Sequence, residues 1–276
     1  MLHNSKLYNS TQLYTTLHNS TQLYTMYYIA VILAGGIGAR VGGNTPKQLL
    51  PLQDGKSVLE HAVDAFEQSP HIHEICIVMH PDYIMHAEQM LLANAWQKVR
   101  HIIPGGKERW ESSVNAIRLY MNQQNSLPFR DGAGVGLLLH DAARPFVSQE
   151  IIANVCEALK EHEAVTVAIP STDTVYEMVD RKVARIPQRS TIMRAQTPQA
   201  FRLELIAEAY SKAFPHLFTT QLGKKEGGSS SPILGGVGGG FPTDDCGVVF
   251  NHLPQVPIYI VEGEEQNKKI TFKEDI

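Results

Sequence analysis

The stretch that decides the fold is Tyr27-Tyr-Ile-Ala-Val-Ile-Leu-Ala34, followed at once by Gly35-Gly-Ile-Gly-Ala-Arg40. The first part is a near-continuous apolar run of strand length, which is typical of a strand buried on both faces of a parallel sheet. The second part places glycines where that strand ends, so the main chain can approach a phosphate chain closely and turn N–H groups toward it. We therefore interpret the stretch as an anion-binding loop at the end of a buried strand.

The rest of the chain repeats the alternation of strand-length apolar runs with stretches of helical period, which predicts an α/β fold with a mostly parallel sheet. Further strands are expected at residues 75–79, 99–103, 135–139, 164–170 and 256–261. Helices are expected at residues 58–67, 84–92, 108–121, 149–161 and 200–214. Residues 171–195 show β-rich alternation without helical period, and they predict a β-hairpin arm that projects from the sheet.

We expect one main domain, residues 26–276, preceded by a tail. Residues 1–25 contain a repeat, Asn9 to Thr15 returning as Asn19 to Thr25, and we expect a disordered low-complexity tail there. The Gly/Ser-rich residues 223–240 predict a flexible surface insertion. Met26 stands directly before the first strand, so we expect translation to begin there, and we expect the sequence to be truncated at its C-terminus because no closing helix precedes Ile276.

Composition favours small-molecule chemistry. The 276 residues carry a formal net charge of -4 without a basic stripe, which disfavours a nucleic-acid partner. No apolar run approaches the roughly 20 residues that span a bilayer, and the N-terminus lacks the regions of a signal peptide. The three cysteines, Cys76, Cys156 and Cys246, are far apart and odd in number. We therefore predict a soluble cytoplasmic protein without a membrane partner, with buried thiols.

Two cations accompany the glycine loop, Arg40 at its end and Lys47 in Pro46-Lys47-Gln48. Fixed cations beside bound phosphates stabilise the charge that grows during phosphoryl or nucleotidyl transfer. A dinucleotide-binding fingerprint is disfavoured, because Val41 stands where its third small residue belongs and no acidic residue closes the second strand. A phosphate-binding P-loop is excluded, because no Gly-Lys-Ser/Thr follows at the required spacing.

Asp141 follows the apolar run 135–139, at the carboxyl end of a predicted strand, where ligand sites of open α/β sheets collect. A carboxylate in that place suits Mg²⁺ bridging nucleotide phosphates, so Asp141 is the metal candidate and Mg²⁺ the expected cofactor. The alternative for Asp141 is a cap of the following turn. We expect His140 to be a packed or hydrogen-bonded residue rather than a catalyst, and Arg144 to brace the loop or contact phosphate.

The pattern Ala34-Gly-Gly-x-Gly-x-Arg40 with Pro46-Lys47-Gln48 resembles the opening of the cytidylyltransferases that act on methylerythritol 4-phosphate, and the related ribitol 5-phosphate enzymes share it. Further matches run almost the length of the chain: Gly105-Gly106 with Arg109 and Ser113, His140-Asp-Ala-Ala-Arg-Pro-Phe146, Asp173-Thr174, Arg189, Gln196-Thr-Pro-Gln-Ala-Phe201, Thr243-Asp244 and Asn267-Lys-Lys-Ile-Thr271. The resemblance implies a Rossmann-like nucleotidyltransferase fold and CMP transfer from CTP to a polyol phosphate, with release of pyrophosphate.

The resemblance also implies the site residues. CTP would bind over the first loop and the Gly-Gly turn, through Leu33, Ala34, Gly35, Gly36, Gly38, Gly105, Gly106, Arg109, Ser113 and Asp141. Arg109 could instead be a solvent-exposed helix residue. Arg40, Lys47 and Lys269 would surround the α-phosphate, and Thr174, Arg189 and Lys269 would hold the acceptor, whose ionised phosphate needs no dedicated general base. Lys268 stands where the family usually has an apolar residue.

In the family the arm crosses to a second subunit, so the resemblance implies a homodimer in which Arg189 completes the acceptor site of the partner. The two branches of the family differ in the acceptor, and the motifs conflict. Residues 33–38 and Ile186-Pro187-x-Arg189 are closer to the ribitol phosphate branch, whereas Asp141-Ala-Ala-Arg-Pro145 is at home among the methylerythritol phosphate enzymes. We predict methylerythritol 4-phosphate as the acceptor and keep ribitol 5-phosphate as the alternative.

Two other functions stay open. A hexose phosphate nucleotidyltransferase using UTP or GTP would share the loop but should lack the context of Gln196-Thr-Pro-Gln199 and Asn267 to Thr271. The other is a nucleotide-sensing module without turnover. The presence of Arg40, Lys47, Asp141 and Lys269 argues against it, because a binding module does not need the full set of charges at the reacting phosphate.

Overall fold

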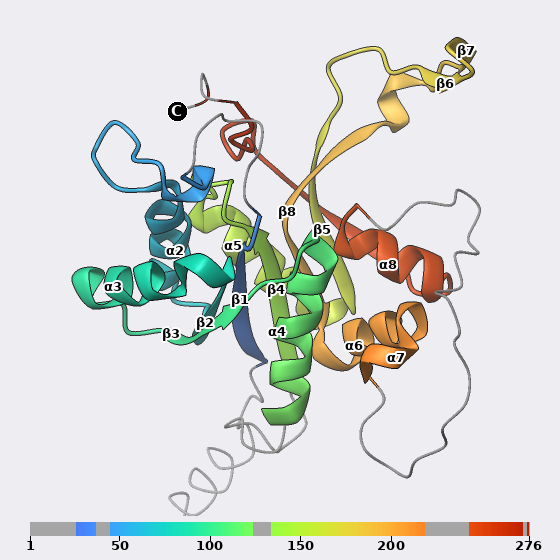
Figure 1. Cartoon of the computed structure of the whole chain (residues 1–276). Helices are drawn as coiled ribbons and strands as arrows, with labels where there is room; N and C mark the ends of the chain where they lie inside the picture. The colour runs from blue at the N-terminus through green and yellow to red at the C-terminus, as the bar shows by residue number, and fades with distance from the viewer. Residues whose placement is uncertain (1–25, 37–44, 124–133, 219–242, 273–274, 276) are drawn as a thin grey trace, which may run out of the picture.

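The computed structural model describes residues 26–36, 45–123, 134–218, 243–272 and 275. Seven strands of this part form one sheet in the order β3-β2-β1-β4-β8-β5-β9, with helices on both faces (Figure 1). The predicted tail, residues 1–25, and the predicted insertion, residues 223–240, lie outside the described residues, as do Gly38 and Arg40.

The sheet is mostly parallel, as expected. Its strands are β1 (Tyr27–Ala34), β2 (Glu74–Met79), β3 (Val99–Pro104), β4 (Val135–Asp141), β5 (Ala164–Pro170), β8 (Met193–Arg202) and β9 (Ile258–Glu262). β1 pairs in parallel with β2 and β4, β2 with β3, and β5 with β9. β8 lies antiparallel between β4 and β5. The α/β class is therefore confirmed.

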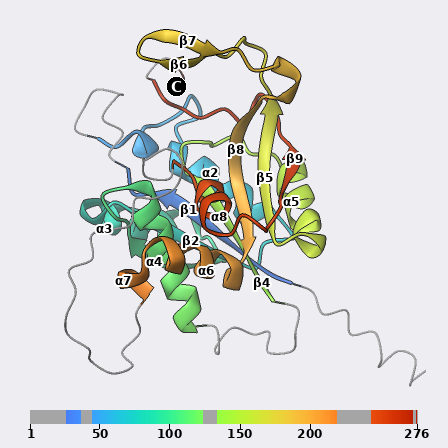
Figure 2. The same cartoon turned by 90° about the vertical axis from the view of Figure 1, so that its right-hand side faces the viewer.

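Two helical layers cover the sheet (Figures 1 and 2). The helices are α2 (Val58–Gln68), α3 (Ile84–Asn94), α4 (Arg109–Gln123), α5 (Gln149–Glu161), α6 (Leu203–Ala213), α7 (Pro215–Phe218) and α8 (Asp245–His252). Short 3-10 turns are η1 (Lys47–Leu49), η2 (Pro81–Tyr83) and η3 (Arg189–Thr191). α2, α3 and α5 contribute to the core on one face, and α4, α6 and α8 to the core on the other. No described helix is both long and apolar enough to cross a membrane.

α2 illustrates how the local sequence sets a helix. It begins after Ser57, whose side chain accepts a hydrogen bond from the Glu60 N–H while the Glu60 carboxylate accepts one from the Ser57 N–H. This reciprocal capping box satisfies two N–H groups that the first turn of a helix otherwise leaves unpaired. Leu59, Val63 and Phe66 recur at helical spacing and are fully buried. The predicted helix 58–67 is thus confirmed.

The predicted helix 200–214 is wrong in its first three residues, because β8 continues to Arg202 and α6 begins at Leu203. Three buried side chains of β8 are polar, namely Gln196, Thr197 and Gln199. The strand therefore lacks the apolar alternation from which a strand is predicted. Its register against β5 also shifts opposite Thr197 and Pro198, which leaves proline outside the regular ladder. Residues 193–195, which the sequence predicts for the arm, belong to the same strand.

The arm is a hairpin of β6 (Glu177–Val179) and β7 (Lys182–Arg185), antiparallel and separate from the main sheet. The two residues that join the strands, Asp180 and Arg181, have positive φ angles of 49° and 62°. This is the backbone twist of a tight hairpin turn. Figures 1 and 2 show the hairpin standing away from the rest of the molecule, as the sequence predicted.

Candidate active site

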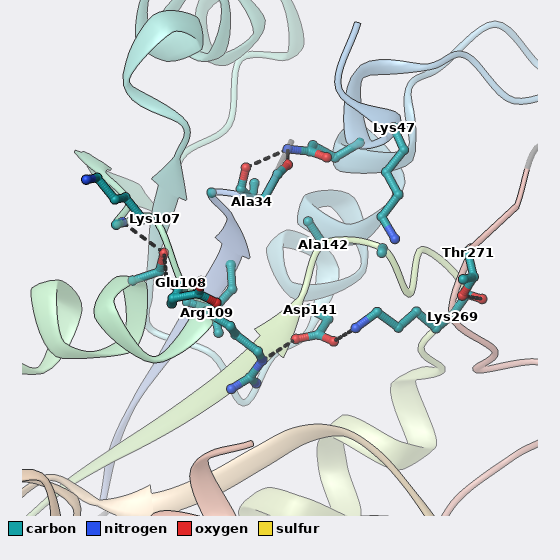
Figure 3. Close-up of a pocket in the computed structure, with 16 residues that line it drawn as sticks. Ala34, Lys47, Lys107, Glu108, Arg109, Asp141, Ala142, Lys269 and Thr271 are labelled. Atoms are coloured by element: carbon teal, nitrogen blue, oxygen red, sulfur yellow. Dashed lines mark hydrogen bonds and ion pairs between the residues drawn. The ribbon is translucent and has the colours of Figure 1, made fainter. Parts of the chain in front are cut away.

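A cavity of about 480 Å³ lies where β1 and β4 end (Figure 3). It brings together nine residues that the sequence predicted for the site: Leu33, Ala34, Gly35, Gly36, Lys47, Gly106, Arg109, Asp141 and Lys269. β1 and β4 are parallel neighbours, with Leu33 paired to Asp141 in register. The carboxyl ends of adjacent parallel strands open into one crevice, which is the usual ligand site of such sheets.

The first loop and the Gly-Gly turn are packed against each other. A Cβ on Gly35 would meet the Ser112 Oγ at 2.8 Å, and a Cβ on Gly105 would meet the Gly35 Cα at 3.0 Å. Neither glycine has a positive φ, so close approach rather than backbone conformation requires them. Gln48 holds the loop from the other side, because its Nε2 donates to the carbonyls of Ala34 and Gly36 at 2.6 and 2.7 Å.

A C-terminal strap, which we define as residues 267–271, closes one side of the cavity. The Ile270 N–H donates to the Ala143 carbonyl at 2.8 Å, and the Lys47 Nζ donates to the Ile270 carbonyl at 2.7 Å. Arg144 donates to the Asn267 carbonyl at 2.7 Å. Arg144 therefore ties its own loop to the strap, which agrees with the expectation that it braces the loop.

Asp141 receives a cation on each carboxylate oxygen. Arg109 Nε donates to Oδ1 at 2.9 Å and Lys269 Nζ to Oδ2 at 2.7 Å (Figure 3). Burial by itself raises the pKa of Asp141, but the charges of Arg109 and Lys269 outweigh burial and hold this pKa well below the usual range. Asp141 is thus a permanently ionised carboxylate between two cations.

Arg109 is no solvent-exposed helix residue. Besides its bond to Asp141, its NH1 donates to the buried Asp245 at 2.6 Å. Burial lowers the pKa of Arg109, but the charges of Asp245 and Asp141 outweigh burial and raise it above the usual value. The guanidinium therefore stays charged in the wall of the cavity.

His140 is fully buried and serves the loop that carries Asp141. Its Nε2 faces the Arg144 carbonyl at 3.0 Å, which requires the proton on Nε2, and its Nδ1 then accepts from the Thr197 hydroxyl at 3.0 Å. The same hydroxyl oxygen accepts from the Asp141 N–H at 3.1 Å. Burial lowers the pKa of His140 to about 4, so the ring is neutral near pH 7. The expectation of a packed, hydrogen-bonded histidine is confirmed.

The side chains of the cavity fit a magnesium ion that takes most of its ligands from nucleotide phosphates and water. These described side chains do not form a site in which protein side chains alone surround the ion. Among the described residues no group of three or more His, Cys, Asp or Glu side chains could hold a metal ion. Mg²⁺ commonly uses one or two carboxylates and takes its other ligands from phosphates and water. Asp141 offers one such carboxylate, and each oxygen keeps a second acceptor position beside its cation.

Four of the described residues that were predicted for the site do not line this cavity. Ser113 is fully buried, and the neighbouring Ser112 lines the cavity instead and accepts from the Gly106 N–H at 3.1 Å. Gly105 packs under the loop. Thr174 and Arg189 are exposed on the arm side of the chain, and the Arg189 NH1 donates to the Thr172 carbonyl at 3.4 Å. Gly38 and Arg40 lie outside the described residues.

The cavity wall also contains residues that were not predicted for the site: Gln48, Lys107, Glu108, Ser112, Ala142, Ala143 and Thr271. Most of them stand inside motifs quoted above, so their position beside a predicted residue was the available signal. Ser112 was missed by one helical position, which corresponds to about 100° around a helix axis. Asp245 gave no signal, because its partner Arg109 is 136 residues away in the chain.

The chain is similar over most of its length to known cytidylyltransferases. A family model described as 2-C-methyl-D-erythritol 4-phosphate cytidylyltransferase matches residues 28–222. The protein of that name from Thermobifida fusca is 39% identical over 253 residues, which cover 90% of this chain and 89% of that protein. The bifunctional ribulose 5-phosphate reductase/CDP-ribitol pyrophosphorylase Bcs1 of Haemophilus influenzae is 34% identical over 250 residues, or 90% of this chain and 46% of that protein.

A solved structure of a protein from the same family is also similar to this chain. The structure of 4-diphosphocytidyl-2C-methyl-D-erythritolsynthase from Anaerococcus prevotii matches with a TM-score of 0.67 and 25% sequence identity. The match covers 91% of this chain and 92% of that one.

Proposed function

We infer the reaction of this chain from the family to which it belongs, that of the 2-C-methyl-D-erythritol 4-phosphate cytidylyltransferases. The chain is accordingly a nucleotidyltransferase. In the reaction that we propose, a phosphate oxygen of 2-C-methyl-D-erythritol 4-phosphate attacks the α-phosphorus of CTP. The new P–O bond gives the CDP-polyol, and the bond between the α-phosphorus and the bridging oxygen breaks to release pyrophosphate.

The gathering of Lys47, Arg109 and Lys269 around Asp141 in one cavity is the observation that carries this proposal. Two reacting anions repel each other, and fixed cations reduce that repulsion as charge grows in the transition state. The Ile270 carbonyl and Asp141 already hold Lys47 and Lys269. Little reorganisation is then needed when substrate arrives. We assign Arg40 and Lys47 to the triphosphate and Lys269 to the α-phosphate and acceptor.

For the nucleotide, we propose that the backbone of Leu33 to Gly36, with Gly38, surrounds the phosphates, and that Gly105, Gly106 and Ser112 line the base end of the site. Ser112 replaces Ser113 in this assignment, because Ser112 lines the cavity. Mg²⁺, when bound through the phosphates and Asp141, supplies further neutralisation of negative charge.

For the acceptor, we propose that a homodimer completes the site. Thr174 and Arg189 belong to the segment that carries the arm and do not line the cavity of their own chain. The arm also exposes large apolar side chains, among them Met178 at 68% and Val183 at 56%. An exposed apolar surface of this kind is typical of a protein contact. We also propose a cytoplasmic location, where three unpaired cysteines are ordinary.

Ribitol 5-phosphate is the second candidate acceptor. It is favoured by the likeness to the Haemophilus influenzae protein, whose name includes a CDP-ribitol pyrophosphorylase, and by Ile186-Pro187-x-Arg189. That branch would use the same CTP site, so the two candidates differ only at the acceptor.

A turnover assay separates these functions. The full chain is incubated with Mg²⁺ and each of CTP, UTP, GTP or ATP, together with methylerythritol 4-phosphate, ribitol 5-phosphate or no acceptor, and pyrophosphate release and the CDP-polyol are measured. We expect turnover with CTP and methylerythritol 4-phosphate at a kcat/KM at least about tenfold above the ribitol compound. A preference for ribitol 5-phosphate would move the chain to the other branch, and CTP binding without turnover would indicate a sensing module.

A further inference from the structure

Asp245 is a buried acid behind the cavity that no part of the proposed reaction uses directly. It is 0% exposed and is the first residue of α8. One carboxylate oxygen accepts from Arg109 NH1 at 2.6 Å, and the other accepts from the Tyr210 hydroxyl at 2.7 Å. With both oxygens engaged, the carboxylate has one preferred orientation.

The backbone at Asp245 is also held in place. The Gln199 side-chain oxygen accepts from the N–H groups of Asp245 and Cys246 at 3.1 and 3.2 Å. Gln199 belongs to β8, so the start of α8 is attached to the central sheet. Asp245 is therefore a fixed anchor.

Arg109 connects this anchor to the cavity. Its NH1 bonds to Asp245 and its Nε to Asp141, while its NH2 is buried without a hydrogen-bond partner among the described residues. A buried donor that lacks a partner is costly. The guanidinium thus lies between two carboxylates although this position leaves one of its nitrogens without a hydrogen bond. Such a local loss of stability is expected where a side chain is positioned for function.

The two cations on Asp141 differ in their support. The Lys269 side chain is 43% exposed and rests on Asp141 alone among the ion pairs of the described residues. Arg109, with 25% of its side chain exposed, is fixed from behind by an acid that solvent does not reach. Arg109 is thus the rigid one of the two supports.

We propose that Asp245 is a positioning residue for nucleotidyl transfer: it clamps Arg109, and Arg109 in turn fixes the direction of the Asp141 carboxylate in the cavity. The proposal rests on the proposed function above. Asp245 does not line the cavity, so its effect on the reaction passes through Arg109.

The test compares two adjacent acids. Asp245→Asn keeps the shape of the side chain and removes the charge that holds Arg109. Asp244→Asn is the matched control. Asp244 caps the same helix through the Gly247 N–H and bonds to Gln199, but the hydrogen bonds and ion pairs that the described residues make with Arg109 come from Asp141 and Asp245. Asparagine caps a helix about as well as aspartate does. kcat and KM for CTP and for the acceptor are measured for each variant, with thermal unfolding as the check on folding.

We expect Asp245→Asn to lower kcat/KM for CTP by about 10- to 100-fold, the usual cost of removing a partner that orients a ligand group. Asp244→Asn is expected to stay within about twofold. Equal effects of the two substitutions would overturn the proposal, because the loss of activity would then come from a general disturbance of α8 and not from the contact with Arg109.

A double-mutant cycle separates positioning from general stability. In an Arg109→Met background, Asp245→Asn is expected to change kcat/KM by less than about twofold, because Asp245 acts through Arg109. An undiminished effect in that background would overturn the proposal. If Asp245→Asn does not fold, Tyr210→Phe enters the same cycle, with an expected loss of about two- to tenfold that disappears with Arg109→Met. A wild-type chain without CTP turnover would overturn both inference and function, whereas an active wild type with an equally active Asp245→Asn would overturn the inference alone.

Discussion

Two of the lysines that line the cavity, Lys47 and Lys269, are tied to the strap of residues 267–271. Lys47 donates to the Ile270 carbonyl, and Lys269, one residue before Ile270, donates to Asp141. A long lysine side chain loses rotamer freedom when it is ordered, and here that ordering precedes substrate binding. The strap therefore places both ammonium groups at the cavity in advance.

Lys269→Ala tests which lysine of the strap serves the phosphate. We expect a loss of about 100- to 1,000-fold in kcat/KM, the range seen when a preorganised group that stabilises transition-state charge is removed. Lys268→Ala is the matched control, because Lys268 is an exposed lysine next to it, and we expect a change of no more than about twofold. The measurement is steady-state turnover of CTP. A larger loss for Lys268→Ala would reverse the assignment.

His140 makes the stability depend on pH. Its pKa is lowered from 6.5 to about 4 in the folded protein, so the unfolded chain binds more protons between these values. The stabilisation from neutral His140 is complete above about pH 6.5 and is lost as pH falls toward 4, by roughly 3 kcal/mol in total.

His140→Gln should therefore destabilise the protein less at pH 5 than at pH 7.5. We expect the difference between wild type and variant in free energy of unfolding to shrink by roughly 2 kcal/mol over this interval. Urea unfolding at both pH values measures it. A constant difference would mean that His140 does not titrate below its ordinary pKa.

At the scale of elements, the arm separates two groups of predicted site residues. The cavity holds most of the residues that were predicted to bind CTP, while Thr174 and Arg189 belong to the segment that carries the hairpin, which stands away from the sheet (Figure 1). A second copy that offered its arm would supply these residues to the cavity. That geometry can be tested by complementation between two defective subunits.

Arg189→Ala and Lys269→Ala are each expected to be nearly inactive alone. After unfolding and refolding a 1:1 mixture, half of the dimers are mixed, and each mixed dimer contains one site with both intact residues. We expect recovery of about a quarter of wild-type activity. Refolding each variant separately is the control. Absence of recovery in a mixture that forms mixed dimers would place Arg189 in the site of its own chain or outside the reaction.

At the scale of the whole molecule, the exposed apolar residues of the arm predict the oligomeric state. Met178 and Val183 pair across the hairpin, so they share one face. We expect wild type to have twice the chain mass of 30.6 kDa, and Met178→Asp to shift it toward a single chain because a charge would be buried in the contact. Light scattering coupled to size exclusion measures this. Leu92→Asp, a change at a residue 81% exposed on α3, should leave the mass unchanged.

Local sequence was sufficient for the α/β class, the close backbone approach at Gly35 and most element bounds. Apolar periodicity reports which faces are buried, and glycines at the end of β1 mark a close backbone approach; both are short-range properties. The carboxyl-end position of Asp141 followed from the same pattern. The apolar pattern did not predict β8, because Gln196, Thr197 and Gln199 are buried with specific hydrogen bonds and are not apolar.

Tertiary packing was needed for the partners within the site. The phase of α4 directs Ser112 into the cavity and Ser113 into the core, a choice that one residue of helix register reverses. The partners of Arg109 come from β4 and α8, 32 and 136 residues away. No local pattern encodes such pairs, because charge pairing across a folded core depends on which elements the sheet order brings together.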